Sequence, residues 1–264
     1  MRIESPANQR IRVFKSLATG KGRREHGRFQ LEGLSLIEEA LKADVAVDAV
    51  YWCPERASGT RERALVEALS EKAEVFEVSE RVLEQMSSTV TPQPIVVEAR
   101  IPDRRLADVV PGERCLIAAP FETQDPGNLG TMVRTAHAVG ATALVGLGNC
   151  VDAYSPKVVR ATMGSLFRLP VIRRAQPDEF LDWCEAKGVE VAAATVHTER
   201  SLYDAVFAPR TAVLLGSETQ GLPGELMGER VTKLAIPMPG GAESLNVAVA
   251  AAIMMYEYRR QHPL

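Results

Sequence analysis

The C-terminal part of this 264-residue chain alternates between two spacings of hydrophobic residues. Short apolar runs predict strands, and apolar positions three and four residues apart predict helices. We expect strands at 115–119, 143–147, 168–173, 189–195, 211–216 and 233–236, and helices at 128–139, 156–163, 177–187 and 245–260. Such alternation indicates an α/β fold with a parallel sheet and helices on both faces.

The N-terminal part shows a shorter mixture of the same two patterns. We expect helices at 8–17, 33–42, 61–72 and 79–86 and strands at 29–31, 45–52, 75–78 and 95–97. The glycines of Gly20-Lys21-Gly22 predict a break in the chain after the first helix. These patterns predict a small α/β domain over 1–100, a linker over 101–112 and a larger domain over 113–264.

The net charge of −3 hides an asymmetry. Eight basic residues against Glu4 and Glu25 give the first 28 residues a net charge of +6, so the remainder carries −9. A basic arm on an acidic body suggests a polyanionic partner such as nucleic acid; the alternative is a solvated, partly disordered N-terminus. The candidate RNA-binding residues in this arm are Arg10, Arg12, Lys15, Lys21, Arg23, Arg24 and Arg28.

Cysteine and histidine usage predicts neither a metal site nor a disulfide framework. The four cysteines (Cys53, Cys115, Cys150 and Cys184) lie far apart, and the four histidines are equally scattered. We therefore expect no metal cofactor and a reducing, cytoplasmic setting. Neither a signal-peptide pattern nor an apolar run long enough for a bilayer is seen, so we expect no membrane association.

Polar residues and glycines follow three of the predicted parallel strands, where such sheets bind ligands. Strand 115–119 leads to Asn128, Gly130 and Arg134, and the last two are expected one turn apart on a helix face separate from its apolar face. Strand 211–216 leads to the loop Gly216–Gly221.

Strand 233–236 leads to the third of these strand ends. Two prolines and Gly240-Gly241 interrupt the chain there. Ser244 is then a candidate N-cap for the last helix, with Asn246 in its first turn.

Two nucleotide-binding motifs begin in this sequence but are not completed. Gly216 and Gly221 have the spacing of a P-loop, yet Leu222 and Pro223 replace the lysine and hydroxyl residue that hold phosphate and Mg²⁺. Gly146 and Gly148 begin a dinucleotide fingerprint that ends at a bulky Val151. Nucleotide hydrolysis is therefore excluded, and an NAD-dependent oxidoreductase is a distant alternative.

Together, the three strand ends resemble the SpoU (TrmH-type) family of RNA ribose 2′-O-methyltransferases in the SPOUT superfamily. Its three motifs are matched by Asn128-x-Gly130-x-x-x-Arg134, by Gly216-x-Glu218 ending in Gly221-Leu222, and by Ile236-Pro237-Met238 followed by Ser244-Leu245-Asn246-Val247. The stretch 152–164, which includes Arg160, is also similar to the family. Residues 28–100 look like its substrate-binding domain, which resembles ribosomal proteins that bind RNA bends.

The resemblance implies a C-terminal domain with a trefoil knot, a homodimer and S-adenosylmethionine as methyl donor. Backbone groups of Gly216, Ile236 and Leu245 are expected to hold the donor. Arg134 is expected to activate the ribose hydroxyl, with Asn128, Ser244 and Asn246 positioning the ribose and Glu218 fixing Arg134 or its loop. Arg160 joins the candidate RNA-binding residues.

The resemblance implies ribosomal RNA as the substrate, because enzymes acting on transfer RNA usually have shorter extensions. Three alternatives remain: a transfer-RNA methyltransferase, a ribosomal RNA methyltransferase that confers antibiotic resistance, and a catalytically silent RNA-binding assembly factor. The intact polar motif residues argue against the last.

Overall fold

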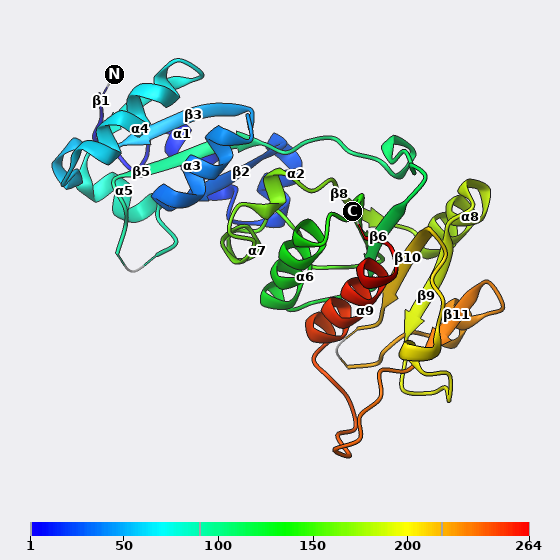
Figure 1. Cartoon of the computed structure of the whole chain (residues 1–264). Coiled ribbons are helices and arrows are strands. Elements are labelled where there is room, and N and C mark those ends of the chain that lie inside the picture. The colour runs from blue at the N-terminus through cyan, green and yellow to red at the C-terminus, as the bar shows by residue number, and fades with distance from the viewer. Residues whose placement is uncertain (1, 90, 218, 264) are drawn as a thin grey trace. The chain divides into compact units, whose positions relative to one another are not determined.

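The computed structural model describes residues 2–89, 91–217 and 219–263, which fold into two compact units (Figure 1). Unit 1 comprises Met1–Asp103 and Tyr154–Phe167, and unit 2 comprises Arg104–Ala153 and Arg168–Leu264. The segment Tyr154–Phe167, which lies within the range 113–264, thus packs with the N-terminal residues.

Unit 1 is built on a mixed five-stranded sheet with the order β1-β4-β3-β5-β2. The strands are β1 (Arg2–Ile3), β2 (Arg28–Glu32), β3 (Val47–Trp52), β4 (Glu74–Val78) and β5 (Ile95–Arg100). Strands β1, β4 and β3 pair in parallel, whereas β5 is antiparallel to both β3 and β2. The predicted strand at 95–97 is therefore an internal strand that joins β2 to the rest of the sheet.

In the part of unit 1 that the structure describes, α-helices accompany the sheet. They are α1 (Gln9–Ser16), α2 (Gly20–His26), α3 (Leu34–Lys42), α4 (Thr60–Ser70), α5 (Glu80–Met86) and α7 (Pro156–Ala161). Fully buried aromatic and aliphatic residues, including Phe14, Tyr51, Phe76 and Leu83, form a core between α1, α5 and the sheet. The basic arm is thus folded, not disordered, in the part of it that the structure describes.

The predicted break after the first helix is confirmed but lies at residues 17–19, and its placement at Gly20-Lys21-Gly22 is wrong, because these residues begin α2. The Thr19 hydroxyl caps the helix by accepting a hydrogen bond from the Gly22 N–H at 3.1 Å. A Cβ at Gly22 would lie 2.1 Å from the carbonyl oxygen of Ser16. Glycine is therefore used for the close approach of α2 to α1, and not to end a helix.

Unit 2 contains a six-stranded sheet with the order β11-β9-β10-β6-β7-β8, in which every pair is parallel. The strands are β6 (Cys115–Pro120), β7 (Ala143–Leu147), β8 (Val171–Ala175), β9 (Glu190–Ala194), β10 (Arg210–Leu215) and β11 (Val231–Leu234). The predicted parallel α/β sheet is confirmed. Its central strands β6, β10 and β7 are almost wholly buried and apolar, as expected when both faces are covered.

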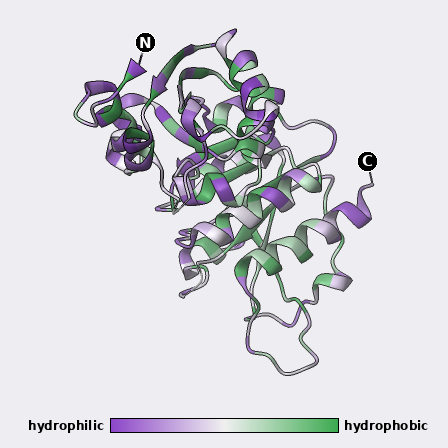
Figure 2. Cartoon of the chain, turned by 90° about the vertical axis from the view of Figure 1, so that its left-hand side faces the viewer, coloured by the Kyte–Doolittle hydropathy of each residue, from purple (hydrophilic) through white to green (hydrophobic). Residues whose placement is uncertain are grey.

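The longer helices of unit 2 are α6 (Pro126–Ala138), α8 (Pro177–Lys187) and α9 (Val247–Gln261). The terminal helix α9 packs on α6 and against β6, β9 and β10. Figure 2 shows α9 as mostly hydrophobic up to a hydrophilic C-terminal end. Short 3₁₀ turns lie at Pro54–Arg56, Leu106–Asp108, Ser165–Phe167, Leu202–Asp204 and Gly224–Met227. In the described ranges, no helix is long and apolar enough to cross a membrane.

Candidate active site

The candidate site lies at the carboxyl edge of the parallel sheet, where β6 leads into α6. Asp125 caps α6, because its Oδ1 accepts a hydrogen bond from the Asn128 N–H at 2.8 Å. Pro126 occupies the first turn, where a missing N–H costs nothing. The first turn of α6 thereby fixes the backbone that carries Asn128.

A hydrogen bond joins the first and third motifs across 118 residues of sequence. Asn246 Nδ2 donates to Asn128 Oδ1 at 2.9 Å. The other end of the Asn246 side chain is also fixed, since its Oδ1 accepts from the N–H groups of Ala248 and Val249 at 2.9 and 3.3 Å. Two residues predicted to act together are therefore held in one geometry by the N-termini of α6 and α9.

The N-cap of the last helix is Asn246, so the expectation that Ser244 caps it is wrong. The Asn246 side chain can reach the N–H groups two and three residues ahead, and helix α9 consequently begins at Val247. Ser244 and Leu245 lie before the helix and are exposed. Both residues remain available to contact a ligand.

Arg134 lies two turns along α6 from the cap and is exposed. Gly130 is buried with Leu129, Met132 and Val133, so the expectation that it shares a separate face with Arg134 is wrong. Within residues 2–89, 91–217 and 219–263, nothing hydrogen-bonds to or ion-pairs with the Arg134 guanidinium. The predicted partner Glu218 lies outside the described residues.

The loop that follows β10 closes tightly on itself. Ser217 and Gly221 exchange two backbone hydrogen bonds, of 3.0 and 3.1 Å. A Cβ at Gly216 would lie 2.4 Å from the backbone carbon of Gly221, and Gly221 has a φ of +66°. Both glycines of this motif are thus required by the backbone: Gly216 for close approach and Gly221 for its left-handed conformation.

The third loop exposes backbone groups where the resemblance places a cofactor. Gly241 closes a turn by donating its N–H to the Met238 carbonyl at 3.0 Å. Ile236 is half-buried and Leu245 is 38% exposed. In the described part of the chain, the N–H groups of Ile236 and Leu245 have no hydrogen-bond partner. Unsatisfied backbone donors of this kind suit a polar ligand.

The cysteines lack the properties of catalytic thiols. All four are free and buried. Burial raises the pKa of Cys150 to about 11 and the pKa of Cys184 to about 12, so both thiols stay protonated at neutral pH. Over the described residues, no cluster of three or more histidine, cysteine or carboxylate side chains is placed to hold a metal ion.

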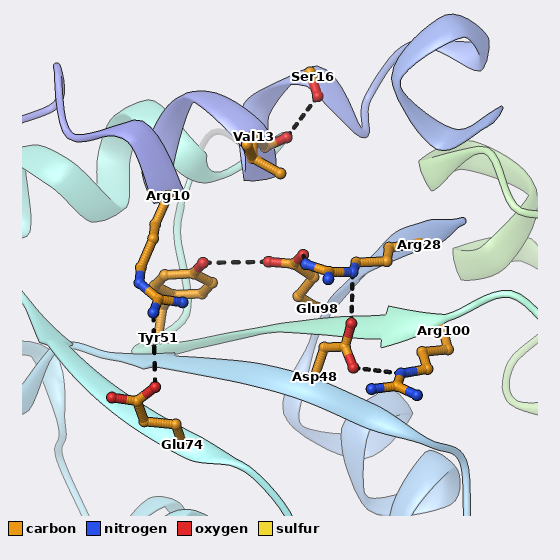
Figure 3. A network of polar contacts seen from close by, with 9 residues as sticks. All are labelled: Arg10, Val13, Ser16, Arg28, Asp48, Tyr51, Glu74, Glu98 and Arg100. Atoms are coloured by element: carbon orange, nitrogen blue, oxygen red, sulfur yellow. Dashed lines mark hydrogen bonds and ion pairs between the residues drawn. The ribbon is translucent and has the colours of Figure 1, made fainter. Parts of the chain in front are cut away.

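The basic arm of unit 1 divides into paired and exposed side chains. The Arg10 guanidinium lies over the Phe76 ring, 4.4 Å from its centre. Arg10 also approaches Glu74 at 3.8 Å (Figure 3). Arg28 ion-pairs with Glu98 and Asp48, both at 2.5 Å. Lys15 donates to Gln85 at 3.4 Å and is exposed. The exposed remainder of the predicted RNA-binding set in this arm comprises Arg12, Lys21 and Arg24.

Arg23 is the one member of the predicted set that the structure removes from the surface. Only 4% of this residue is exposed. Its Nη1 donates to the carbonyls of Leu17 and Ala18 at 2.8 and 3.0 Å, which satisfies carbonyl groups at the C-terminus of α1. Arg23 therefore holds the α1–α2 junction and is not available to RNA.

Arg160 is oriented within unit 1 by a chain of hydrogen bonds. Its Nη1 donates to Ser88 Oγ at 2.6 Å, and Ser88 Oγ donates to the buried Glu32 carboxylate at 2.8 Å. Glu32 also accepts bonds from the Ser88 N–H and from the hydroxyls of Ser87 and Thr89. Burial opposes the charge on Glu32, but these hydrogen bonds outweigh it and hold the pKa of Glu32 below its usual value.

Comparison with known proteins places the chain in a family. Residues 116–256 match the model of the SpoU rRNA Methylase family, and residues 8–97 match the MRM3-like substrate binding domain. The chain belongs to the SpoU rRNA methylase family. It is therefore an RNA methyltransferase by class, and its N-terminal part is a substrate-binding domain.

Relatives similar over nearly the whole chain support this assignment. The chain is 36% identical to the 23S rRNA (guanosine(2553)-2′-O)-methyltransferase RlmP of Bacillus subtilis, over 97% of this chain and 98% of that protein. It is 29% identical to a 23S rRNA (uridine(2479)-2′-O)-methyltransferase of Streptomyces viridochromogenes, over 96% and 90%. An AdoMet-bound rRNA methyltransferase from Sinorhizobium meliloti has a TM-score of 0.89 and 32% identity, over 100% and 98%.

Sequence reasoning missed the polar network of Tyr51, Glu98 and Asp48 in unit 1. Glu98 is 2% exposed and lies in the middle of β5, where its neighbours Val97 and Ala99 are buried. The available signal was a single charge inside the apolar strand Ile95–Arg100. A charge in that position is unusual unless it is paired.

Proposed function

We propose that this protein transfers the methyl group of S-adenosylmethionine to a ribose 2′-hydroxyl of 23S ribosomal RNA. The observation that carries the proposal is the Asn128–Asn246 hydrogen bond, which joins two motifs of the family at the sheet edge. Whole-length similarity to two enzymes named for 23S rRNA 2′-O-methylation supports ribosomal RNA over transfer RNA.

The loops beyond β10 and β11 fit the methyl donor. In the loop that follows β10, the backbone at Gly216 lies so close to that of Gly221 that a side chain at Gly216 would clash. The N–H groups of Ile236 and Leu245 are available as hydrogen-bond donors. When bound, S-adenosylmethionine supplies a methyl group on a sulfonium, which needs no further activation. In the reaction the ribose oxygen forms a bond to the methyl carbon, the carbon–sulfur bond breaks, and the hydroxyl proton is lost.

Arg134 is the proposed activating residue. Its guanidinium is exposed and presents N–H donors but no acceptor. We therefore assign it to orienting the 2′-hydroxyl and stabilising the charge that develops on its oxygen, with the proton passing to a phosphate of the RNA or to water. Asn128, Asn246 and Ser244 position the ribose, and Glu218 fixes Arg134 or its loop.

The substrate contacts of unit 1 are proposed to be mainly electrostatic. Arg12, Lys15, Lys21 and Arg24 are exposed, and Arg160 is oriented by Ser88. Contacts between such side chains and RNA phosphates release bound counterions. RNA affinity should therefore fall steeply with salt.

A homodimer built on α9 is also proposed. Val249 and Tyr256 are 47 and 55% exposed, and their spacing of seven residues places them along one stripe of α9. A second copy of the chain would cover this stripe. Replacing Val249 with Asp should give a monomer in light scattering; an unchanged dimer mass would contradict the assignment of this face.

We further propose that the chain has the family's trefoil knot and works in a reducing cytoplasm. Residues 235–246 run from the edge strand β11 to α9, which packs against the central strands β6 and β10, and the Ala235 N–H donates to the Arg200 carbonyl on the way. Four free, buried cysteines are compatible with a reducing compartment.

The experiment that tests the function begins with calorimetric titration of the purified protein with S-adenosylmethionine, and with NAD as the control. Binding of the first and not the second is expected. Methyl transfer from labelled S-adenosylmethionine to unmodified 23S rRNA is then measured. Donor binding without transfer to 23S rRNA or to transfer RNA would favour a silent RNA-binding protein.

A further inference from the structure

A hollow in unit 1 lies beside α1 and over strands β2, β3 and β5. Its volume is about 340 Å³, and it is lined by Gln9, Arg10, Val13, Arg28, Tyr51 and Glu98. This volume is at the small end of the roughly 300–1,000 Å³ range of small-molecule sites. The space suits a single planar group, such as one base, and not a stretch of duplex.

The floor of the hollow carries a buried charge. Glu98 is 2% exposed and accepts hydrogen bonds from Arg28 Nη1 at 2.5 Å and from the Tyr51 hydroxyl at 3.2 Å (Figure 3). Each bond uses a different carboxylate oxygen, so each oxygen keeps a lone pair. The carboxylate is buried, whereas 40% of the Arg28 side chain that pairs with it is exposed. Glu98 therefore places a negative charge beneath the hollow, next to a cation that solvent can reach.

One wall of the hollow is a flat cation. The Arg10 guanidinium carbon lies 4.4 Å from the centre of the Phe76 ring, and Arg10 also lines the hollow. Planar guanidinium groups stack on unpaired bases in RNA complexes. Since Arg12 and Lys15 are exposed on the same helix, the phosphates on either side of such a base would find cations nearby.

The donors and acceptors of the hollow match one base in particular. A carboxylate offers two acceptor oxygens side by side, and guanine presents an imino and an amino N–H side by side on its Watson–Crick edge. Adenine and cytosine offer only an amino group there, and uracil offers only an imino group. The Arg28 guanidinium, which lies beside Glu98, supplies a donor for the guanine carbonyl.

We propose that this hollow binds one unpaired guanine of the RNA substrate, with its Watson–Crick edge on Glu98 and Arg10 against its face. The proposal rests on the proposed function, because it assumes that unit 1 binds the RNA. It adds a base-specific contact, distant in sequence from the methyl-transfer motifs, to a surface otherwise expected to contact phosphates.

The test compares five-nucleotide RNAs that differ only in the central base, with binding to the full-length protein measured by fluorescence anisotropy. The RNA with guanine should bind at least about 5-fold more tightly than each of the other three, the lower end for a bidentate base contact. Glu98→Gln should abolish this preference, because an amide offers only one acceptor.

Arg10 and Arg12 provide a matched pair of variants on one helix. Arg10→Ala and Arg12→Ala each remove one positive charge, so both should weaken binding at low salt. Only Arg10→Ala should remove the preference for guanine, and that loss should persist at high salt. Arg10→Lys should lose the preference as well, since it keeps the charge but not the flat face.

Several outcomes would overturn the proposal. These are equal affinity for the four RNAs, a preference for another base, a guanine preference unaffected by Arg10→Ala, or equal effects of Arg10→Ala and Arg12→Ala. Thermal melting measures whether each variant is folded. If Glu98→Gln does not fold, the effect of Arg10→Ala on the guanine preference tests the proposal. Binding of S-adenosylmethionine is measured in parallel, so that failure of this site is distinguished from failure of the proposed function.

Discussion

The two units place their polar chemistry in opposite ways. In unit 1, charged and amide side chains are buried on the strands and helices themselves, as with Glu32, Gln30 and Arg23. In unit 2, the central strands are apolar, and the candidate catalytic residues lie in the loops and helices that follow the strand ends. Substitutions of the catalytic residues in unit 2 should therefore change activity with little effect on the core. In unit 1, substitution of a buried polar residue should also change the stability of the core.

The largest effect should come from a residue that the unit 2 fold does not need. Arg134→Ala should lower methyl transfer at least about 10³-fold, because an oriented charge at the reacting oxygen is lost. Stability and S-adenosylmethionine binding should hardly change, since Arg134 is exposed. Single-turnover transfer to 23S rRNA and calorimetry measure these quantities. Near-normal transfer by Arg134→Lys would show that the planar guanidinium is not needed.

The Asn246 side chain separates capping from catalysis. Asn246→Asp keeps the oxygen that caps α9 but replaces the amide nitrogen that donates to Asn128. It should retain stability and lose about 10²-fold in methyl transfer, the lower range for removing one positioned donor. Asn246→Ala should also lose about 1 kcal/mol of stability with the cap. Equal transfer by the wild type and Asn246→Asp would contradict the positioning role.

Unit 1 should respond to change through stability. Glu32→Gln weakens the hydrogen bonds with Ser87, Ser88 and Thr89 and should cost about 2 kcal/mol at neutral pH. The pKa of Glu32 is lowered in the folded state, so the stabilisation is present above the unfolded pKa and lost as pH falls through the folded value. Urea unfolding at pH 7 and at pH 3 measures it. If the difference in unfolding free energy between the wild type and Glu32→Gln were as large at pH 3 as at pH 7, this role of the Glu32 carboxylate would be contradicted.

The smallest effect is expected from Ser88→Ala. This change removes the hydroxyl that links Arg160 to Glu32 and should weaken RNA binding by about 3-fold, the equivalent of one modest hydrogen bond. The effect should vanish in an Arg160→Ala background, which a double-mutant cycle of RNA affinities detects. Additive losses would mean that Ser88 does not act through Arg160.

The parallel sheet and the three loops of unit 2 could be predicted because their signals are local. Apolar runs marked the strands, and the motif residues directly follow them. Ser244 and Asn246 are both good N-cap residues, and only the geometry shows which side-chain oxygen accepts hydrogen bonds from the helix N–H groups. Gly22 was interpreted as a helix breaker because the close approach of Ser16 leaves no trace in the sequence.

The polar network of unit 1 could not be predicted because its members lie on three strands whose pairing is not local. Glu98, Arg28 and Tyr51 come together only when β5 inserts antiparallel between β2 and β3. The same limit applies to Arg23, which charge counting placed on the surface although it holds the end of α1. The packing of Tyr154–Phe167 in unit 1 likewise depends on contacts between residues far apart in the sequence.

The central claim is that the protein 2′-O-methylates ribosomal RNA. The most direct measurement is incubation with unmodified 23S rRNA and labelled S-adenosylmethionine, followed by alkaline hydrolysis, since a methylated 2′-oxygen protects the adjacent phosphodiester. We expect one labelled, alkali-resistant dinucleotide, which should be absent with Arg134→Ala. Label recovered only in alkali-sensitive mononucleotides, or no label from a protein that binds the donor, would contradict it.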